Sequence, residues 1–184
     1  MENKIKEIHL FLLEKCDHAC KLCCNKQYDV DKIPVITVDE LKQVETILFT
    51  GGEPFLIGEN RLTELAKRIK TQYSNIKNIY VYTSGAALLE YLEDDNTLSY
   101  FDGVSIAPKN KYDVACLEAL FFRYNRVLNN LRSNRIYMFP EFKDKIETIY
   151  NSTSELNHID LIDRKWQETF EPGAGVFRRL PILF

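Results

Sequence analysis

The stretch Cys16-Asp17-His18-Ala19-Cys20-Lys21-Leu22-Cys23 places three thiols at C-x3-C-x2-C spacing, directly after the apolar run 8–13. Three cysteines this close together cannot all pair with one another as disulfides, but their sulfurs can turn toward one metal centre. Short steps of this kind bring several thiolates onto one cube of iron and sulfide. A [4Fe-4S] cube holds four irons, so three ligands leave one iron open, and an open position is typical of a reactive metal site.

A second motif, Thr50-Gly51-Gly52-Glu53-Pro54, follows another apolar run at 47–49. Because its two glycines have no Cβ atom, the backbone can approach a ligand closely. The glutamate can accept a hydrogen bond from the ammonium group of a bound amino acid, and the proline stiffens the loop. Taken alone, this motif also fits an ordinary turn from a strand into a helix.

The two motifs in this order resemble those of the radical S-adenosylmethionine (SAM) superfamily. The resemblance implies that Cys16, Cys20 and Cys23 bind a [4Fe-4S] cluster and that SAM chelates the open iron. It also implies that the 51–54 loop, from Gly51 to Pro54, helps to hold the SAM amino group. An electron from the cluster would then cleave SAM to methionine and a 5′-deoxyadenosyl radical. The resemblance covers roughly residues 7–110 well and the rest of the chain weakly.

By the same resemblance, three polar residues at later strands are expected to bind the cofactor. Ser84 and Ser105 would face the carboxylate or the ribose of SAM, although each also fits a buried, hydrogen-bonded hydroxyl. Lys109 follows the fourth expected strand and would pair with a carboxylate of SAM or of a substrate.

Two local features indicate different subgroups of the superfamily. Asn25 gives a C-x-N step that resembles the activating enzymes of glycyl-radical proteins, and a loop asparagine that caps its own backbone explains it equally well. The run 105–109, Ser-Ile-Ala-Pro-Lys, resembles 7-carboxy-7-deazaguanine synthase, with Ala107 where that enzyme has a serine. Leu22 departs from the aromatic residue that usually precedes the third cysteine, so the contacts to adenine stay open.

The remaining cysteines leave a different metal to consider at the same loop. Cys24 either lies beside the cluster or replaces Cys23 as its third ligand, and Cys116 fits a buried core thiol. A structural zinc site completed by Cys24 or Cys116 is the alternative, but zinc sites favour two separated pairs of ligands. His18 lies inside the cysteine loop, where solvent exposure is expected rather than a hydrogen bond to the cluster.

Hydrophobic periodicity predicts an alternation of strands and helices along most of the chain. Strands are expected at 8–13, 46–50, 78–83, 103–107, 135–139 and 158–162, and helices at 37–45, 60–72, 86–92, 112–132 and 142–150. This order predicts an α/β fold with parallel strands and right-handed crossovers. The resemblance implies a partial (β/α)6 barrel with outer helices. Residues 1–184 are expected to form a single domain, with an irregular tail at 163–184 that packs on the core.

Composition excludes several classes of protein. A formal net charge of −3 and a pI near 5.7 argue against attraction of nucleic acid or anionic lipid over the whole surface. The charged start at 1–6 and the short apolar run after it fit neither a signal peptide nor a membrane span. A cytoplasmic location is therefore expected, where thiols stay reduced and suit a metal site.

The sequence favours a radical SAM enzyme, an oxidoreductase that abstracts hydrogen from a protein glycyl radical site or from a small molecule. Its partners would be an electron donor such as flavodoxin or ferredoxin and the substrate itself. The alternative is a degenerate cluster-binding protein that does not cleave SAM and acts in electron transfer or as an interaction module. The residues do not identify the substrate or the oligomeric state.

Overall fold

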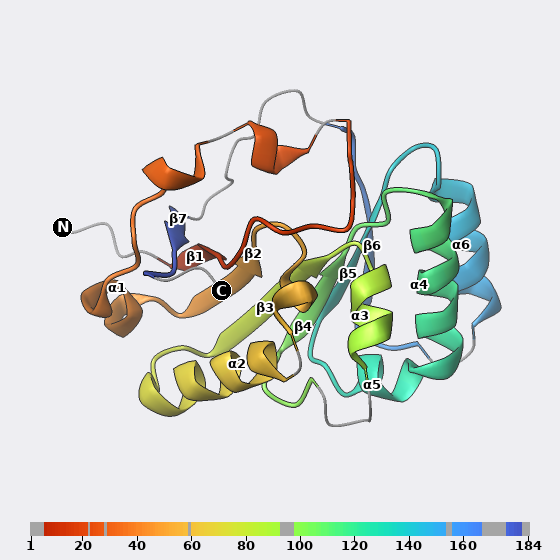
Figure 1. Ribbon diagram of the computed structural model, residues 1–184. Helices are drawn as coiled ribbons and strands as arrows, with labels where there is room; N and C mark the ends of the chain where they lie inside the picture. Colours follow the sequence, from red (N-terminus) through yellow and green to blue (C-terminus); the bar gives the residue numbers. More distant parts are fainter. Residues whose placement is uncertain are drawn as a thin grey trace.

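The structure is a computed structural model that describes residues 6–21, 23–27, 29–58, 60–92, 98–153, 156–166 and 176–181 (Figure 1). Its strands are β1 (Glu7–Phe11), β2 (Thr46–Thr50), β3 (Asn78–Thr83), β4 (Gly103–Ile106), β5 (Asn134–Met138), β6 (Ile159–Asp163) and β7 (Val176–Arg179). Its α-helices are α1 (Val38–Gln43), α2 (Arg61–Gln72), α3 (Ala86–Tyr91), α4 (Lys111–Arg123), α5 (Asn125–Asn129) and α6 (Lys143–Ser152). Three short 3₁₀ turns are η1 (Cys24–Lys26), η2 (Val30–Lys32) and η3 (Pro54–Ile57).

The strands form one sheet in the order β6-β5-β4-β3-β2-β1-β7, and every pairing is parallel. Parallel neighbours need a crossover, and helices supply it between most consecutive strands of the first six. The predicted fold class, an α/β sheet of parallel strands with outer helices, is therefore confirmed. The polar residues that follow the strands accordingly lie together at the carboxyl ends of the strands, which is where α/β proteins bind ligands.

Alternation along the strands separates two faces of the sheet. One face carries aliphatic side chains such as Ile8, Ile47, Ile79 and Ile136, which pack with the apolar sides of α2, α3, α4 and α6 into one core. Figure 1 shows these helices along one side of the sheet. The alternating positions form the other face, which we refer to as the inner face: His9, Leu48, Tyr80, Tyr82, Ser105, Arg135, Tyr137 and Phe177.

The number of strands differs from the prediction because the C-terminal tail adds β7. The expectation of an irregular tail at 163–184 is corrected: Val176 pairs with Ile8 and Arg179 with Phe11, so β7 extends the sheet beyond β1. The edge of β1 would otherwise present unpaired backbone groups, and strand addition satisfies them. The 171–175 turn and the last three residues of the tail lie outside the described residues.

The expected long helix 112–132 is two helices. Tyr124 interrupts it with φ −121° and ψ 25°, and the chain restarts as α5. The break turns Val127 and Leu128 into the core, where both are almost fully buried. None of the helices in the described part of the chain has the length and hydropathy needed to cross a bilayer.

Candidate cluster and ligand site

The three predicted cluster ligands lie on the loop that leaves the carboxyl end of β1. Cys16 is exposed, Cys20 and Cys23 are partly buried, and all three are free thiols. The segment between β1 and α1 passes over the top of the molecule in Figure 1, away from α2 and α5. The side chain of Cys24 and the whole of Leu22 lie outside the described residues, so their predicted roles stay predictions.

The thiols of the loop act on one another electrostatically, Cys20 on Cys16 and Cys23 on Cys20. Partial burial, with smaller contributions from the nearby Asp17, Glu53 and Cys20, raises the pKa of Cys16 to about 11. Burial also raises the pKa of Cys20, with Cys23 adding to the effect and Lys109 opposing it. The metal-free thiols of Cys16 and Cys20 are therefore protonated at neutral pH, and binding of a metal must release their protons.

His18 fixes the cysteine loop to the start of α4. Its Nε2 lies 2.8 Å from both carboxylate oxygens of Asp113, and its Nδ1 faces Asp17. Burial lowers the pKa of His18, but these hydrogen bonds raise it above its ordinary value overall. Because both ring nitrogens face carboxylates, both must donate, which is the protonated form.

The expectation that His18 is solvated is therefore wrong, since only 9 % of its side chain is exposed. The pairing partner, Asp113, is fully buried and also accepts a hydrogen bond from the backbone N–H of Lys109 at 2.7 Å. Asp113 thus connects the cysteine loop with the loop after β4. No signal in the sequence identified this pair, because 95 residues separate the two side chains.

Gly51 and Gly52 are required by the contact between two loops. A Cβ on Gly52 would lie 1.9 Å from the carbonyl oxygen of Lys15, and one on Gly51 would lie 2.5 Å from that of Leu13. The amide of Gly52 donates to Leu13 O at 2.7 Å, and that of Glu53 donates to Lys15 O at 2.9 Å. The two glycines therefore allow the turn to pack directly against the first residues of the cysteine loop.

Glu53 follows these glycines and is a buried carboxylate beside that loop. The backbone N–H and the hydroxyl of Ser84 donate to its Oε2 at 2.9 and 3.2 Å. Burial raises the pKa of Glu53 to about 7, although the hydrogen bond from the Ser84 amide opposes the shift. Within the described chain, Glu53 forms no ion pair with a cation. Pro54, also buried, begins the η3 turn that follows.

The other predicted cofactor residues lie on neighbouring strands. Ser84 follows β3, and Ser105 on β4 is 1 % exposed. Among the described residues, Ser105 Oγ has no hydrogen-bond partner. A buried hydroxyl without a partner is uncommon and indicates a missing polar ligand.

Lys109 is held by two aromatic rings that the sequence did not identify as part of the site. Its Nζ lies 4.3 Å from the ring centre of Phe139 and 5.1 Å from that of Trp166. These two rings stack on each other with centroids 4.1 Å apart. Period-two alternation in β5 could have identified Phe139 as facing the same side as Arg135 and Tyr137.

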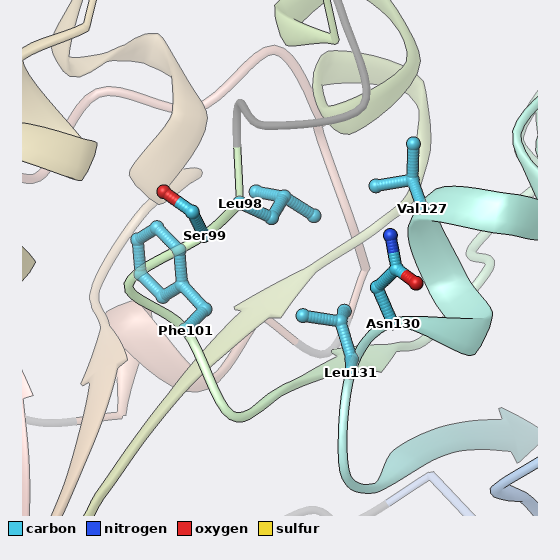
Figure 2. Close-up of a pocket in the computed structure, with 6 residues that line it drawn as sticks. All are labelled: Leu98, Ser99, Phe101, Val127, Asn130 and Leu131. Atoms are coloured by element: carbon cyan, nitrogen blue, oxygen red, sulfur yellow. The ribbon is translucent and has the colours of Figure 1, made fainter.

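The described structure also has cavities lined by residues other than the predicted site residues. Figure 2 shows one of about 50 Å³ lined by Leu98, Ser99, Phe101, Val127, Asn130 and Leu131. Its lining residues precede β4 and β5, at the opposite end of the sheet from the cysteine loop. A space of this size holds one or two water molecules and no cofactor.

The comparison with protein families gives one match. A model described as a 4Fe-4S single cluster domain matches residues 7–117, more than half of the chain. The match contains the cysteine loop, the glycine turn, Ser84, Ser105 and Lys109. No curated protein matches the sequence significantly.

Two solved structures show a weak likeness to the chain. One is described as native anSMEcpe with bound AdoMet and Cp18Cys peptide. The two sequences are 14 % identical, the match covers 85 % of this chain and 50 % of that chain, and the TM-score is 0.49. The other is the catalytic domain of a family GH18 chitinase from a fern, Peteris ryukyuensis, at 12 % identity, 85 % and 67 % coverage and a TM-score of 0.38. The chain spans about half the length of the first structure. Neither likeness decides the function.

Proposed function

The chain belongs to the 4Fe-4S single cluster domain family, and from this premise we propose that it is a radical SAM enzyme. Cys16, Cys20 and Cys23 are the proposed cluster ligands. The proposed SAM site consists of Gly51, Gly52, Glu53, Pro54, Ser84, Ser105 and Lys109.

One observation carries this proposal: a buried carboxylate that pairs with no cation among the described residues lies beside a loop of three free thiols. Asp17 and Cys16 of the loop both interact electrostatically with Glu53. A buried carboxylate is costly unless a cation pairs with it. The ammonium group of SAM would supply that charge and favour ionised Glu53.

The other residues fit a ligand that is polar along one side. Ser105 Oγ offers a buried hydroxyl that lacks a partner among the described residues, which suits an oxygen of the ribose or the carboxylate. The Lys109 ammonium, held between the cysteine loop and two rings, suits a carboxylate. The close packing of Gly52 on the backbone of Lys15 holds Glu53 and the cysteine loop together.

When bound, a reduced [4Fe-4S] cluster and SAM would supply the radical chemistry that removes hydrogen from a substrate. The chain's own residues orient SAM, hold its charges and exclude water from the apolar side of the site. An electron donor such as flavodoxin or ferredoxin is the proposed partner. The substrate is either a protein glycyl radical site or a small molecule.

Removal of single cysteines tests this proposal. The protein is reconstituted anaerobically with iron and sulfide, reduced with dithionite and incubated with SAM. We expect the wild type to form 5′-deoxyadenosine. Cys16→Ala, Cys20→Ala and Cys23→Ala should each lose most of the bound iron and form no detectable product, because each variant removes one of the three proposed thiolate ligands.

Cys116→Ala is the matched control, because Cys116 is a buried thiol on α4 outside the loop. It should keep both iron and product formation. A brown wild-type protein that binds iron but leaves SAM intact would indicate the degenerate cluster protein. A colourless protein with stoichiometric zinc would overturn the cluster assignment altogether.

A further inference from the structure

Two arginines on the inner face of the sheet have no carboxylate partner among the described residues. The guanidinium carbon of Arg135 lies 5.5 Å from the ring centre of Tyr80, and that of Arg164 lies 4.8 Å from the ring centre of Tyr137. Neither forms an ion pair with any described residue. By contrast, Arg178 on the other edge of the sheet pairs closely with Glu40. The described part of the chain therefore supplies no counter-charge to these two inner-face arginines.

The charges of the two guanidinium groups act on the same hydroxyl group, that of Tyr82. Burial and the neighbouring Tyr137 raise the pKa of Tyr82, and the charges of Arg135 and Arg164 both act in the opposite direction. Asp160 is the register neighbour of Arg135, but it is exposed and forms no ion pair within the described chain. Two positive charges therefore lie beside the rings of β3 and β5, although the chain as a whole carries a net charge of −3.

Lys109 places a further positive charge between this region and the cysteine loop. Its ammonium contacts the rings of Phe139 and Trp166, which follow β5 and β6, and its charge lowers the pKa of Cys20. An anion bound in front of Arg135 and Arg164 would therefore lie on the same side of the sheet as the proposed cluster.

A row of rings crosses the inner face beside these charges. The rings of Phe177 and His9 stack with centroids 5.3 Å apart, those of His9 and Tyr82 at 6.1 Å, and those of Tyr82 and Tyr137 at 6.3 Å. Their interplanar angles stay between 10° and 21°. Such a row offers apolar surface to the body of a ligand whose charged end meets the arginines.

We propose that Arg135 and Arg164, supported by Tyr80 and Tyr137, bind the substrate through a carboxylate or phosphate group. This inference rests on the proposed function, because it assigns the substrate class of the same site. A guanidinium presents a planar set of donors that matches both anions. Stacking on the tyrosine rings orients each guanidinium before the ligand arrives, which lowers the entropic cost of binding.

Equilibrium dialysis of the anaerobically reconstituted protein tests the site with two probes, radiolabelled inorganic phosphate and radiolabelled succinate. We expect saturable binding of at least one probe. Binding of phosphate alone indicates a phosphate ester as substrate, and binding of succinate alone indicates a carboxylate. Arg135→Gln and Arg164→Gln should each weaken binding by about tenfold or more, as expected for loss of a charged hydrogen bond.

Arg123→Gln is the matched control, since it removes the same charge from an exposed position on α4. It should bind the probe as the wild type does. Arg135→Lys and Arg164→Lys should restore part of the affinity, and they replace the glutamine variants if those fail to fold in a thermal melt.

Three results would overturn the inference: no saturable binding of either probe, equal weakening by Arg123→Gln, or displacement of the probe by SAM. The last result would assign the arginines to the cofactor. Formation of 5′-deoxyadenosine by the wild type is measured separately. A protein that binds the anion but does not cleave SAM would lose the proposed function and retain an anion site.

Discussion

The carboxyl group of Glu53 is balanced between its protonated and its ionised form. Its position after two glycines places it beside the cysteine loop, where burial raises its pKa from an ordinary 4.5 to about 7. The two hydrogen bonds from Ser84 stabilise the carboxylate only in part. In the ligand-free protein, ionisation of Glu53 therefore opposes folding.

Glu53→Gln tests this balance through the pH dependence of stability. A raised folded-state pKa contributes stability below pH 4.5 that is lost as the pH rises through 7. The unfolding free energy of the wild type, relative to the variant, should fall by about 3 kcal/mol between pH 4.5 and pH 8. Urea unfolding of the cluster-free protein across this range measures it.

Glu64→Gln, on the exposed side of α2, is the control and should show no such trend relative to the wild type. The difference in unfolding free energy between the wild type and Glu53→Gln could instead stay constant from pH 4.5 to pH 8. The pKa of Glu53 would then be the same in the folded and the unfolded protein, and its proposed role in binding the SAM ammonium group would lose support.

At the scale of elements, Glu40 joins the first helix to the last strand. Its Oε2 accepts from the backbone N–H of Thr37 at 3.0 Å, which completes the predicted capping box of α1. Its Oε1 accepts from Arg178 of β7 at 2.6 Å. Burial raises the pKa of Glu40, but the hydrogen bonds from Arg178 and Thr37 outweigh it and lower the pKa overall.

Arg178→Gln should destabilise the protein by about 1–3 kcal/mol, because it leaves a partly buried carboxylate without its cation. Urea unfolding at neutral pH measures the loss. The loss should shrink as the pH falls through the lowered pKa of Glu40, since protonated Glu40 no longer attracts Arg178. Lys42→Gln is the control: its pair with Asp39 is exposed at 3.7 Å and should contribute almost nothing. Equal effects of the two variants would mean that β7 is not held by this pair.

At the scale of the whole molecule, the hydrophobic core and the cysteine loop are separate. The core consists of apolar residues on one face of the sheet and on the helices that cover it. Cys16, Cys20 and Cys23 contribute nothing to it, in contrast to small domains that are unfolded without their metal. The parallel sheet is therefore expected to persist when the cluster is removed.

Removal of iron from the reconstituted protein with a chelator should leave the far-ultraviolet circular dichroism essentially unchanged. Hydrogen exchange of backbone amides in the loop 14–27 should accelerate, whereas that in β2, β3 and β4 should not. A protein of unchanged sequence kept at the same pH without chelator provides the reference. Loss of the sheet on chelation would show that the cluster is part of the folding core.

The sequence by itself determined the order of the elements and the position of both motifs. The apolar runs at 46–50 and 78–83 form β2 and β3 with the predicted bounds, because strand formation depends on the local pattern of apolar residues. The capping box of Thr37 was equally local. The roles of the three cysteines and of Gly51, Glu53 and the other proposed cofactor residues stay predictions that the family match supports.

Tertiary structure alone decided which distant side chains meet. Three features join segments that no local pattern connects: the pairing of His18 with Asp113, the addition of β7 beside β1, and the contacts of Arg135 with Tyr80 and of Arg164 with Tyr137. Their partners are fixed by strand order and register, which depend on how the whole core packs. A one-residue shift in register would turn Arg135 toward the helices and Ile136 toward the inner face, so the charge of the site is a property of the assembled sheet.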